Sequence, residues 1–294
     1  MHIPRSIMRA VVRVVIKPVL SDRVSPQRQR SIVDGLARTA VLPKGTRVEP
    51  GQLGARRADR IVTAASNPDH ALLYLHGGGY TVGSLTSHRS PAAHLAHTAG
   101  VVAHLLDYRL APEHPYPAAV EDAVAAYRAL LAQGLPAERI LVAGDSAGGA
   151  LALALVLRLR AEDVPLPRAI ALISPWVDLR LDGLADVDDP MLSRGWLERC
   201  ARDYAGADLA RPEVSPLLAD LTGLPPMLVH GTSDEILIDD VERLVDRARD
   251  AGVDVTYQRL DGLWHVAHLY AGMMRESTEA VTAMGRWLRA RLDA

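Results

Sequence analysis

Short apolar runs alternate with longer, helix-like stretches from residue 70 onward. The runs have the length of buried strands, and we predict strands over residues 71–75, 101–106, 140–143, 169–173, 227–230 and 253–260. The stretches among them predict helices over residues 91–99, 118–133, 150–160, 239–251 and 278–292. Strands and helices that alternate in this way are typical of a mostly parallel sheet with helices on both faces.

Two segments interrupt this alternation. Residues 176–224 hold tryptophans, several prolines and short helical pieces without a clear strand, so we expect an insertion that caps the strand ends. Residues 1–45 precede the first plausible strand, and we expect their helices to join the same cap. The core then comprises residues 46–175 and 225–294. The predicted fold is α/β, with a mostly parallel central sheet flanked by helices and covered by a helical cap.

The first twenty residues carry a cation at every fourth position, namely Arg5, Arg9, Arg13 and Lys17. These charges interrupt a run of Ile and Val, so we expect neither a secretory signal nor a membrane span there. On a helix the cations form one stripe, with the Ile and Val side chains largely on another face. We expect a cap helix whose apolar face covers the site entrance and whose cations face water. The alternative is a basic helix that makes weak contact with an anionic membrane surface.

The sequence Gly-Asp-Ser-Ala-Gly over residues 144–148 lies between a predicted strand and a predicted helix. This is the context of a nucleophile elbow, a tight turn that exposes a serine hydroxyl. Small residues must flank the serine, and Gly144 and Gly148 meet that need. A phosphate-binding loop is the rival, but no lysine follows and no G-x-G-x-x-G spacing is present. Ser146 is therefore the predicted nucleophile.

Gly77, Gly78 and Gly79 follow the predicted strand over residues 71–75. Glycines leave their backbone N–H groups open to approach. In an acyl-transfer enzyme two of these N–H groups, together with that of Ala147, hold the oxyanion. A flexible turn is the plainer interpretation, but it does not account for a glycine triplet that ends a buried strand upstream of an elbow.

A serine nucleophile needs a base and an orienting acid, in the chain order serine, acid, histidine. His230 falls inside a predicted strand, whereas His265 lies in the loop before the final helix and His268 lies one helical turn further on. His265 is the predicted base. Two histidines without a third ligand of suitable spacing predict no metal site.

For the acid, Asp234 is the first carboxylate after the strand over residues 227–230. Glu235, Asp239 and Asp240 compete with it. The latter two resemble first-turn helix residues, where carboxylates offset the helix dipole without a catalytic duty. Asp234 is therefore the predicted orienting acid.

Together these motifs resemble the hormone-sensitive-lipase-type esterases, in particular the bacterial branch whose elbow reads Gly-Asp-Ser-Ala-Gly. The resemblance covers about residues 45–290 and is carried by residues 76–79, 107–115, 144–149, 234–240 and 264–265. It implies an α/β-hydrolase fold, no cofactor, and hydrolysis of small-molecule esters with short to medium acyl chains. It also implies an oxyanion site on Gly78, Gly79 and Ala147.

Two features depart from the family pattern. Val266 and Ala267 follow the histidine, where the family often has Gly-Phe or Val-Phe, and the chain contains no Phe. The walls of the acyl pocket must then be Trp, Tyr or aliphatic side chains. We expect Tyr80, Asp145 and Trp264, which flank the motifs, to contact the substrate.

The remaining features constrain partners and location. The net charge of −2 indicates no nucleic-acid partner. Cys200 is the only cysteine, so we expect a small buried side chain, no internal disulfide and a cytoplasmic protein. Arg109 and Glu113 are expected to fix a loop near the site through ion pairing. A homodimer is compatible with the chain.

Rival functions use the same machinery. Lactone opening, arylformamide hydrolysis and deacetylation of small metabolites would need every motif above. A rival of another class is a non-catalytic binding protein, like the plant gibberellin receptors, which resemble this family but lack the catalytic histidine. Because His265 is present, we predict a carboxylic ester hydrolase that uses Ser146, His265 and Asp234.

Overall fold

The strands of the central sheet lie in the order β1-β2-β4-β3-β5-β6-β7-β8 in the computed structural model, which describes residues 2–293. Their bounds are β1 (Arg47–Leu53), β2 (Arg56–Val62), β3 (Asn67–Leu75), β4 (Val101–Leu106), β5 (Ile140–Asp145), β6 (Ala169–Ile173), β7 (Met227–Asp234) and β8 (Val255–Trp264). From β4 to β8 all neighbours pair in parallel, whereas β1 and β2 are antiparallel to their neighbours. Every strand predicted from an apolar run is confirmed.

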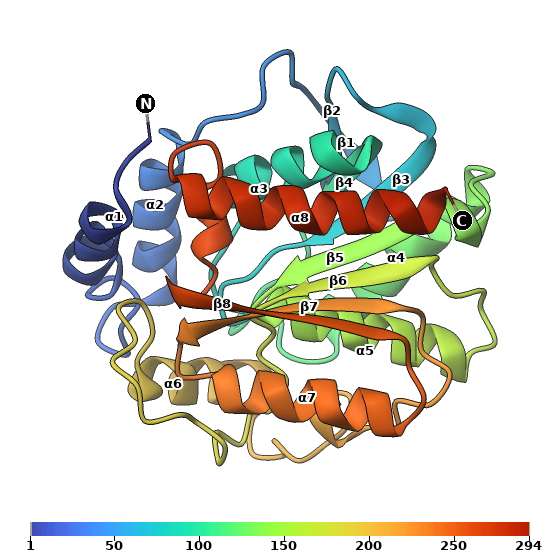
Figure 1. Ribbon diagram of the computed structural model, residues 1–294. Helices are drawn as coiled ribbons and strands as arrows, with labels where there is room; N and C mark the ends of the chain where they lie inside the picture. Colours follow the sequence, from blue (N-terminus) through green and yellow to red (C-terminus); the bar gives the residue numbers. More distant parts are fainter. Residues whose placement is uncertain (1, 294) are drawn as a thin grey trace.

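Helices cover both faces of this sheet (Figure 1). α3 (Leu85–Ala99) and α8 (Arg275–Leu292) pack on one face, and α4 (Ala118–Ala132), α5 (Ala147–Ala161) and α7 (Ile238–Asp250) pack on the other. Successive strand residues point to opposite faces, so Leu72 belongs to the apolar core under α3 and α8, whereas Leu73 belongs to the core under α4 and α5. Burial on both faces explains why these strands read as continuous apolar runs.

The antiparallel hairpin of β1 and β2 was not predicted. Six of the seven residues of β1 are at least partly exposed, and only Leu53 is buried. Pro50 and Gly51 lie in its centre, at the edge of the sheet where proline is tolerated. A strand that buries almost nothing leaves no apolar run or clean alternation in the sequence, so the pattern fails there.

Two segments lie against the carboxyl ends of β5, β7 and β8 (Figure 1). The N-terminal segment contains α1 (Arg5–Val11), the π-helical turn η1 (Val12–Ile16) and α2 (Pro26–Ala37). The insertion between β6 and β7 contains α6 (Arg194–Ala205) and the short turn η3 (Pro216–Leu218). The two touch, because Trp196 Nε1 donates to Gln29 Oε1 at 3.2 Å. We refer to them together as the cap.

The cationic stripe of the N-terminal segment contacts the protein, so the prediction that its side chains turn to water holds only in part. Arg5 and Arg13 are exposed, whereas Arg9 and Lys17 are half-buried. Arg13 Nη2 donates to Asp188 Oδ2 at 2.7 Å, Lys17 Nζ donates to the Asp189 carbonyl oxygen at 2.6 Å, and Arg9 pairs with Asp234. Acidic residues of the insertion and of β7 thus attract the stripe. The apolar side chains of the same helix are left more exposed, and only Met8 and Val12 are buried.

No helix among residues 2–293 combines the length and the apolar composition needed to cross a bilayer.

Candidate active site

Ser146 occupies a strained turn between β5 and α5. Its φ of 52° is unusual for a residue with a side chain. The chain passes so close to its neighbours that a Cβ atom on Gly144 would lie 2.2 Å from the Gly148 carbonyl oxygen, and one on Gly148 would lie 2.0 Å from that of Leu75. The Ser146 N–H donates to the Ile173 carbonyl oxygen at 2.8 Å, which ties the turn to β6. These contacts hold the hydroxyl at the carboxyl end of the sheet.

His265 joins this serine to a carboxylate. It lies between β8 and the 3₁₀ turn η4 (Ala267–Tyr270), and its Nε2 accepts from Ser146 Oγ at 2.9 Å. Its Nδ1 donates to Glu235 Oε2 at 2.6 Å. All three side chains are buried. The arrangement matches the relation that a nucleophile, a general base and an orienting acid require.

The prediction of Asp234 as the orienting acid is wrong, because Glu235 holds that position. Asp234 is the last residue of β7, and its carboxylate accepts from Ser233 Oγ at 2.7 Å and pairs with Arg9. Burial would raise the pKa of Asp234, but Ser233 and Arg9 hold that pKa below its ordinary value. Glu235 Oε1 accepts from the Thr232 N–H at 2.8 Å, which leaves Oε2 for the histidine.

The glycine triplet lies beside the serine. Gly78 lines the same cavity as Ser146, and its φ of 115° is reserved for glycine. A Cβ atom on Gly77 would lie 2.2 Å from Asp145 Oδ2, so only glycine fits there as well. Within residues 2–293, the N–H groups of Gly78, Gly79 and Ala147 donate to no protein acceptor.

Asp145 lines the cavity, but its carboxylate is engaged with the protein. It accepts from Tyr74 Oη at 2.9 Å and from His88 Nε2 at 3.2 Å. Burial would raise the pKa of Asp145, yet the charge of His88 and these hydrogen bonds hold it below its ordinary value. The carboxylate therefore anchors the strand that precedes the serine.

Tyr80 and Trp264 do not line the cavity, so the substrate contacts expected for them are not found. Tyr80 is buried and stacks on Tyr204, with ring centroids 3.7 Å apart. Trp264 is fully buried and lies beside Tyr270. A residue next to a motif in sequence need not line the same cavity, because the backbone conformation at each residue sets the direction of its side chain.

Two further histidines, His230 and His268, form a buried pair. His230 Nδ1 and His268 Nε2 are 3.0 Å apart. Burial lowers the pKa of His268 to about 4 and also lowers that of His230, so both rings are neutral near pH 7. No cluster of three or more potential metal ligands occurs within the part of the chain that the structure describes.

The catalytic cavity has a volume of about 330 Å³. Ser146, His265 and Gly78 lie in its lining, and both cap segments supply apolar walls. The wall residues from the cap include Ile7, Met8, Val11, Val15, Leu36, Met191, Leu192 and Trp196. Aliphatic side chains thus take the place of phenylalanines, as the composition predicted.

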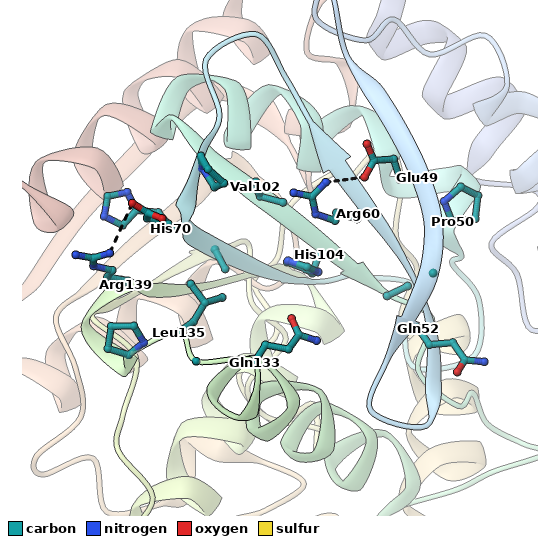
Figure 2. A pocket seen from close by; sticks show the side chains of 17 residues that line it. Glu49, Pro50, Gln52, Arg60, His70, Val102, His104, Gln133, Leu135 and Arg139 are labelled. Atoms are coloured by element: carbon teal, nitrogen blue, oxygen red, sulfur yellow. Dashed lines mark hydrogen bonds and ion pairs between the residues drawn. The ribbon is translucent and has the colours of Figure 1, made fainter.

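A larger cavity, of about 580 Å³, lies near the amino ends of β3 and β4 (Figure 2). Its lining is polar, and Arg60 Nη1 of β2 donates to Glu49 Oε2 of the adjacent strand β1 at 2.6 Å on one wall. No serine is among the described residues that line it, and His70 lies in the amino half of β3, whereas Ser146 follows the carboxyl end of the neighbouring strand β5. Size alone would select this cavity, but the acyl-transfer geometry lies in the smaller one.

Arg109 and Glu113 each form ion pairs that fix this loop, as expected, although with partners in α4 and in the cap. Arg109 Nε binds Asp122 Oδ1 at 3.0 Å, within the loop and the start of α4. Glu113 Oε2 accepts from Arg30 Nη2 of α2 at 2.7 Å, and this hydrogen bond lowers the pKa of Glu113 to about 2. Glu113 therefore ties the loop to the cap.

Comparisons with known proteins agree with this geometry. The family model for the alpha/beta hydrolase fold matches residues 72–269. An acetyl-hydrolase of Streptomyces hygroscopicus is 44% identical over 233 residues, or 78% of each chain. An esterase of Acinetobacter venetianus is 34% identical over 278 residues, covering 92% of this chain and 91% of the relative. A solved esterase from the bacterial hormone-sensitive lipase family has a TM-score of 0.92 and 35% identity, covering 99% of this chain and 100% of that one.

Proposed function

The chain belongs to the bacterial hormone-sensitive-lipase family of α/β-hydrolases and is a serine carboxylesterase, and on that premise we propose that Ser146, His265 and Glu235 cleave esters of short to medium acyl chains. One observation carries the assignment of residues. The hydrogen bonds from Ser146 Oγ to His265 Nε2 and from His265 Nδ1 to Glu235 Oε2 form one continuous chain at an apolar cavity.

The proposed reaction has two halves. Ser146 Oγ attacks the ester carbonyl carbon while His265 Nε2 takes the hydroxyl proton, and Glu235 stabilises the resulting imidazolium. Two N–H groups of the glycine triplet and the N–H of Ala147 hold the oxyanion. The imidazolium returns its proton to the departing alcohol. Water then attacks the acyl-enzyme with His265 as base, and the acid leaves.

Short acyl chains are expected to be preferred. The cavity volume of about 330 Å³ is near the small end of the range for ligand pockets, and the acetyl-hydrolase relative supports a small acyl group. Initial rates on p-nitrophenyl esters from acetate to palmitate should peak at or below roughly eight carbons. Parallel assays separate the rival activities; their substrates are emulsified triolein, δ-valerolactone, an arylformamide and acetylated metabolites. Comparable rates on triolein would contradict the preference.

We also propose that the cavity mouth contacts lipid surfaces through an apolar rim. Among residues 2–293, the large apolar side chains that are exposed are Ile7, Val11, Val14, Val15, Leu36 and Val41, between 39% and 71% exposed. Four of them also line the catalytic cavity, so the rim is continuous with the substrate path. The neighbouring cations are engaged with carboxylates, which favours apolar contact over attraction to anionic lipid.

The double variant Val14→Ser/Val41→Ser tests this rim without touching the cavity wall. Adsorption to neutral phosphatidylcholine vesicles should weaken roughly tenfold, because each valine loses part of an apolar contact that contributes about 1.5 kcal/mol or more when fully formed. KM for p-nitrophenyl acetate should not change. Unchanged adsorption would count against the rim. A dimer in the unaltered protein that dissociates in the variant would instead assign the rim to a second copy.

We further propose a cytoplasmic location, which the cysteine supports. Cys200 is the only cysteine and is buried beside Thr81, with Sγ 3.3 Å from the threonine hydroxyl. Burial raises its pKa to about 12, so the thiol stays protonated. A chain without disulfides needs no oxidising compartment to fold.

A further inference from the structure

Asp189 of the insertion is a buried carboxylate that is held by backbone N–H groups. It is 2% exposed, and no ion pair to it occurs among residues 2–293. Its Oδ1 accepts from the N–H groups of Met191 at 2.7 Å and Leu192 at 2.9 Å. Its Oδ2 accepts from the Ile236 N–H at 3.1 Å. The two oxygens thus bind two different parts of the molecule.

Both parts belong to the site. Met191 and Leu192 line the catalytic cavity, and Ile236 directly follows Glu235. The insertion also binds the carbonyl group of the same residue, since the Ala185 N–H donates to the Ile236 carbonyl oxygen at 2.8 Å. The residue after the acid is therefore held by the insertion at both its N–H and its C=O.

The residue before the acid is held by the other cap segment. Asp234 pairs with Arg9 of α1, as described above. Among residues 2–293, the Glu235 carboxylate receives hydrogen bonds only from the core, namely from the Thr232 N–H and His265 Nδ1. The cap therefore forms no hydrogen bond with this carboxylate, but it binds the residues on either side of Glu235.

We propose that Asp189 is a positioning residue for the acid Glu235, and that it couples the acyl-pocket wall at Met191 and Leu192 to the geometry of the triad. The inference rests on the proposed role of Glu235. Burying a carboxylate costs free energy unless hydrogen bonds compensate it, and three N–H donors do so here. Burial nevertheless raises the pKa of Asp189, so the hydrogen bonds offset the cost only in part. A displacement of about 1 Å in a catalytic group can lower the rate 10²-fold.

A double-mutant cycle tests the coupling. Asp189→Asn is made alone and together with Glu235→Gln, and each protein is assayed with p-nitrophenyl acetate and for the rate of Ser146 labelling by a fluorophosphonate. Asp189→Asn alone should lower kcat about 10- to 100-fold with KM little changed. With Glu235→Gln already present, the same change should cost less than about twofold, because the group that Asp189 positions is gone. Asp188→Asn, a neighbouring exposed carboxylate, is the matched control and should leave kcat unchanged.

Other outcomes overturn the proposal. If Asp189→Asn lowers kcat equally with and without Glu235→Gln, then Asp189 supports the overall structure and does not position Glu235. If the variant instead raises KM increasingly with acyl length while kcat stays constant, then Asp189 acts on the pocket wall alone. If Asp189→Asn does not fold, Ala185→Pro removes the N–H that binds the Ile236 carbonyl and should show the same pattern. A small effect of Glu235→Gln by itself would instead sink the proposed function.

Discussion

Replacing Ser146 with alanine is expected to lower kcat on p-nitrophenyl acetate by about 10⁶-fold, by analogy with the loss of the nucleophile in another serine hydrolase. The hydroxyl oxygen forms the acyl-enzyme, and among residues 2–293 its only side-chain hydrogen-bond partner is His265. The change removes one oxygen from a turn whose strain lies in the backbone. The melting temperature should therefore stay close to that of the unaltered protein.

Labelling by a fluorophosphonate checks the same point independently of turnover. The Ser146→Ala protein should not be labelled, whereas Ser31→Ala, which removes an exposed hydroxyl bonded to its own helix, should be labelled at the normal rate. Substantial ester hydrolysis by Ser146→Ala, with no contaminating esterase, would remove the basis of the proposed mechanism.

Glu235→Gln is expected to lower kcat by about 10⁴-fold, by analogy with the amide substitution of the buried acid in a serine protease. The amide can still accept a hydrogen bond, but it carries no charge to stabilise the imidazolium. It can also donate to His265 Nδ1 and so favour the wrong tautomer. Because Glu235 is fully buried and bonded to His265 at 2.6 Å, no water can readily take over its role.

Asp234→Asn and Asp239→Asn are the controls for this prediction. Asp239 is exposed in the first turn of α7, so its replacement should change kcat by less than about twofold. Asp234→Asn loses the partly exposed pair with Arg9, and we expect at most about tenfold in kcat through the altered neighbour of Glu235. A larger loss at Asp234 than at Glu235 would show that the hydrogen bonds described here are not those of the working enzyme.

The fold class and the family were predictable from the sequence. The six predicted strands and five predicted helices are present. Buried parallel strands require continuous apolar runs, and helices such as α7 have a periodic apolar face, whereas α5 is buried on all sides over residues 147–156 and is apolar throughout. The resemblance to hormone-sensitive-lipase-type esterases is confirmed by the comparisons. The position of Ser146 was equally predictable, since a strand, a tight turn and a helix form within a few consecutive residues.

The sequence pattern was less informative where packing decides exposure. β1 buries only Leu53, and β2 buries Ala58, Asp59 and Ile61, so the β1–β2 hairpin left no apolar run in the sequence. The stripe of Arg9, Arg13 and Lys17 is visible in the sequence, but its contacts depend on Asp188, the Asp189 carbonyl oxygen and Asp234, which are distant in the chain. A helical stripe shows which residues share a face, not what that face meets.

The choice of acid shows the same limit most sharply. Asp234 and Glu235 are adjacent, equally compatible with the chain order, and both follow the buried part of β7. Successive side chains at the end of a strand point in opposite directions, so one of them reaches His265 and the other reaches Arg9. Which of the two carboxylates reaches His265 depends on where the loop after β8 places the imidazole. That position is set by the pairing of β7 with β8. The sequence by itself determined the elbow, the histidine and the fold that joins them. Only the tertiary structure decided the acid and the walls of the pocket, because those contacts join segments distant in the chain.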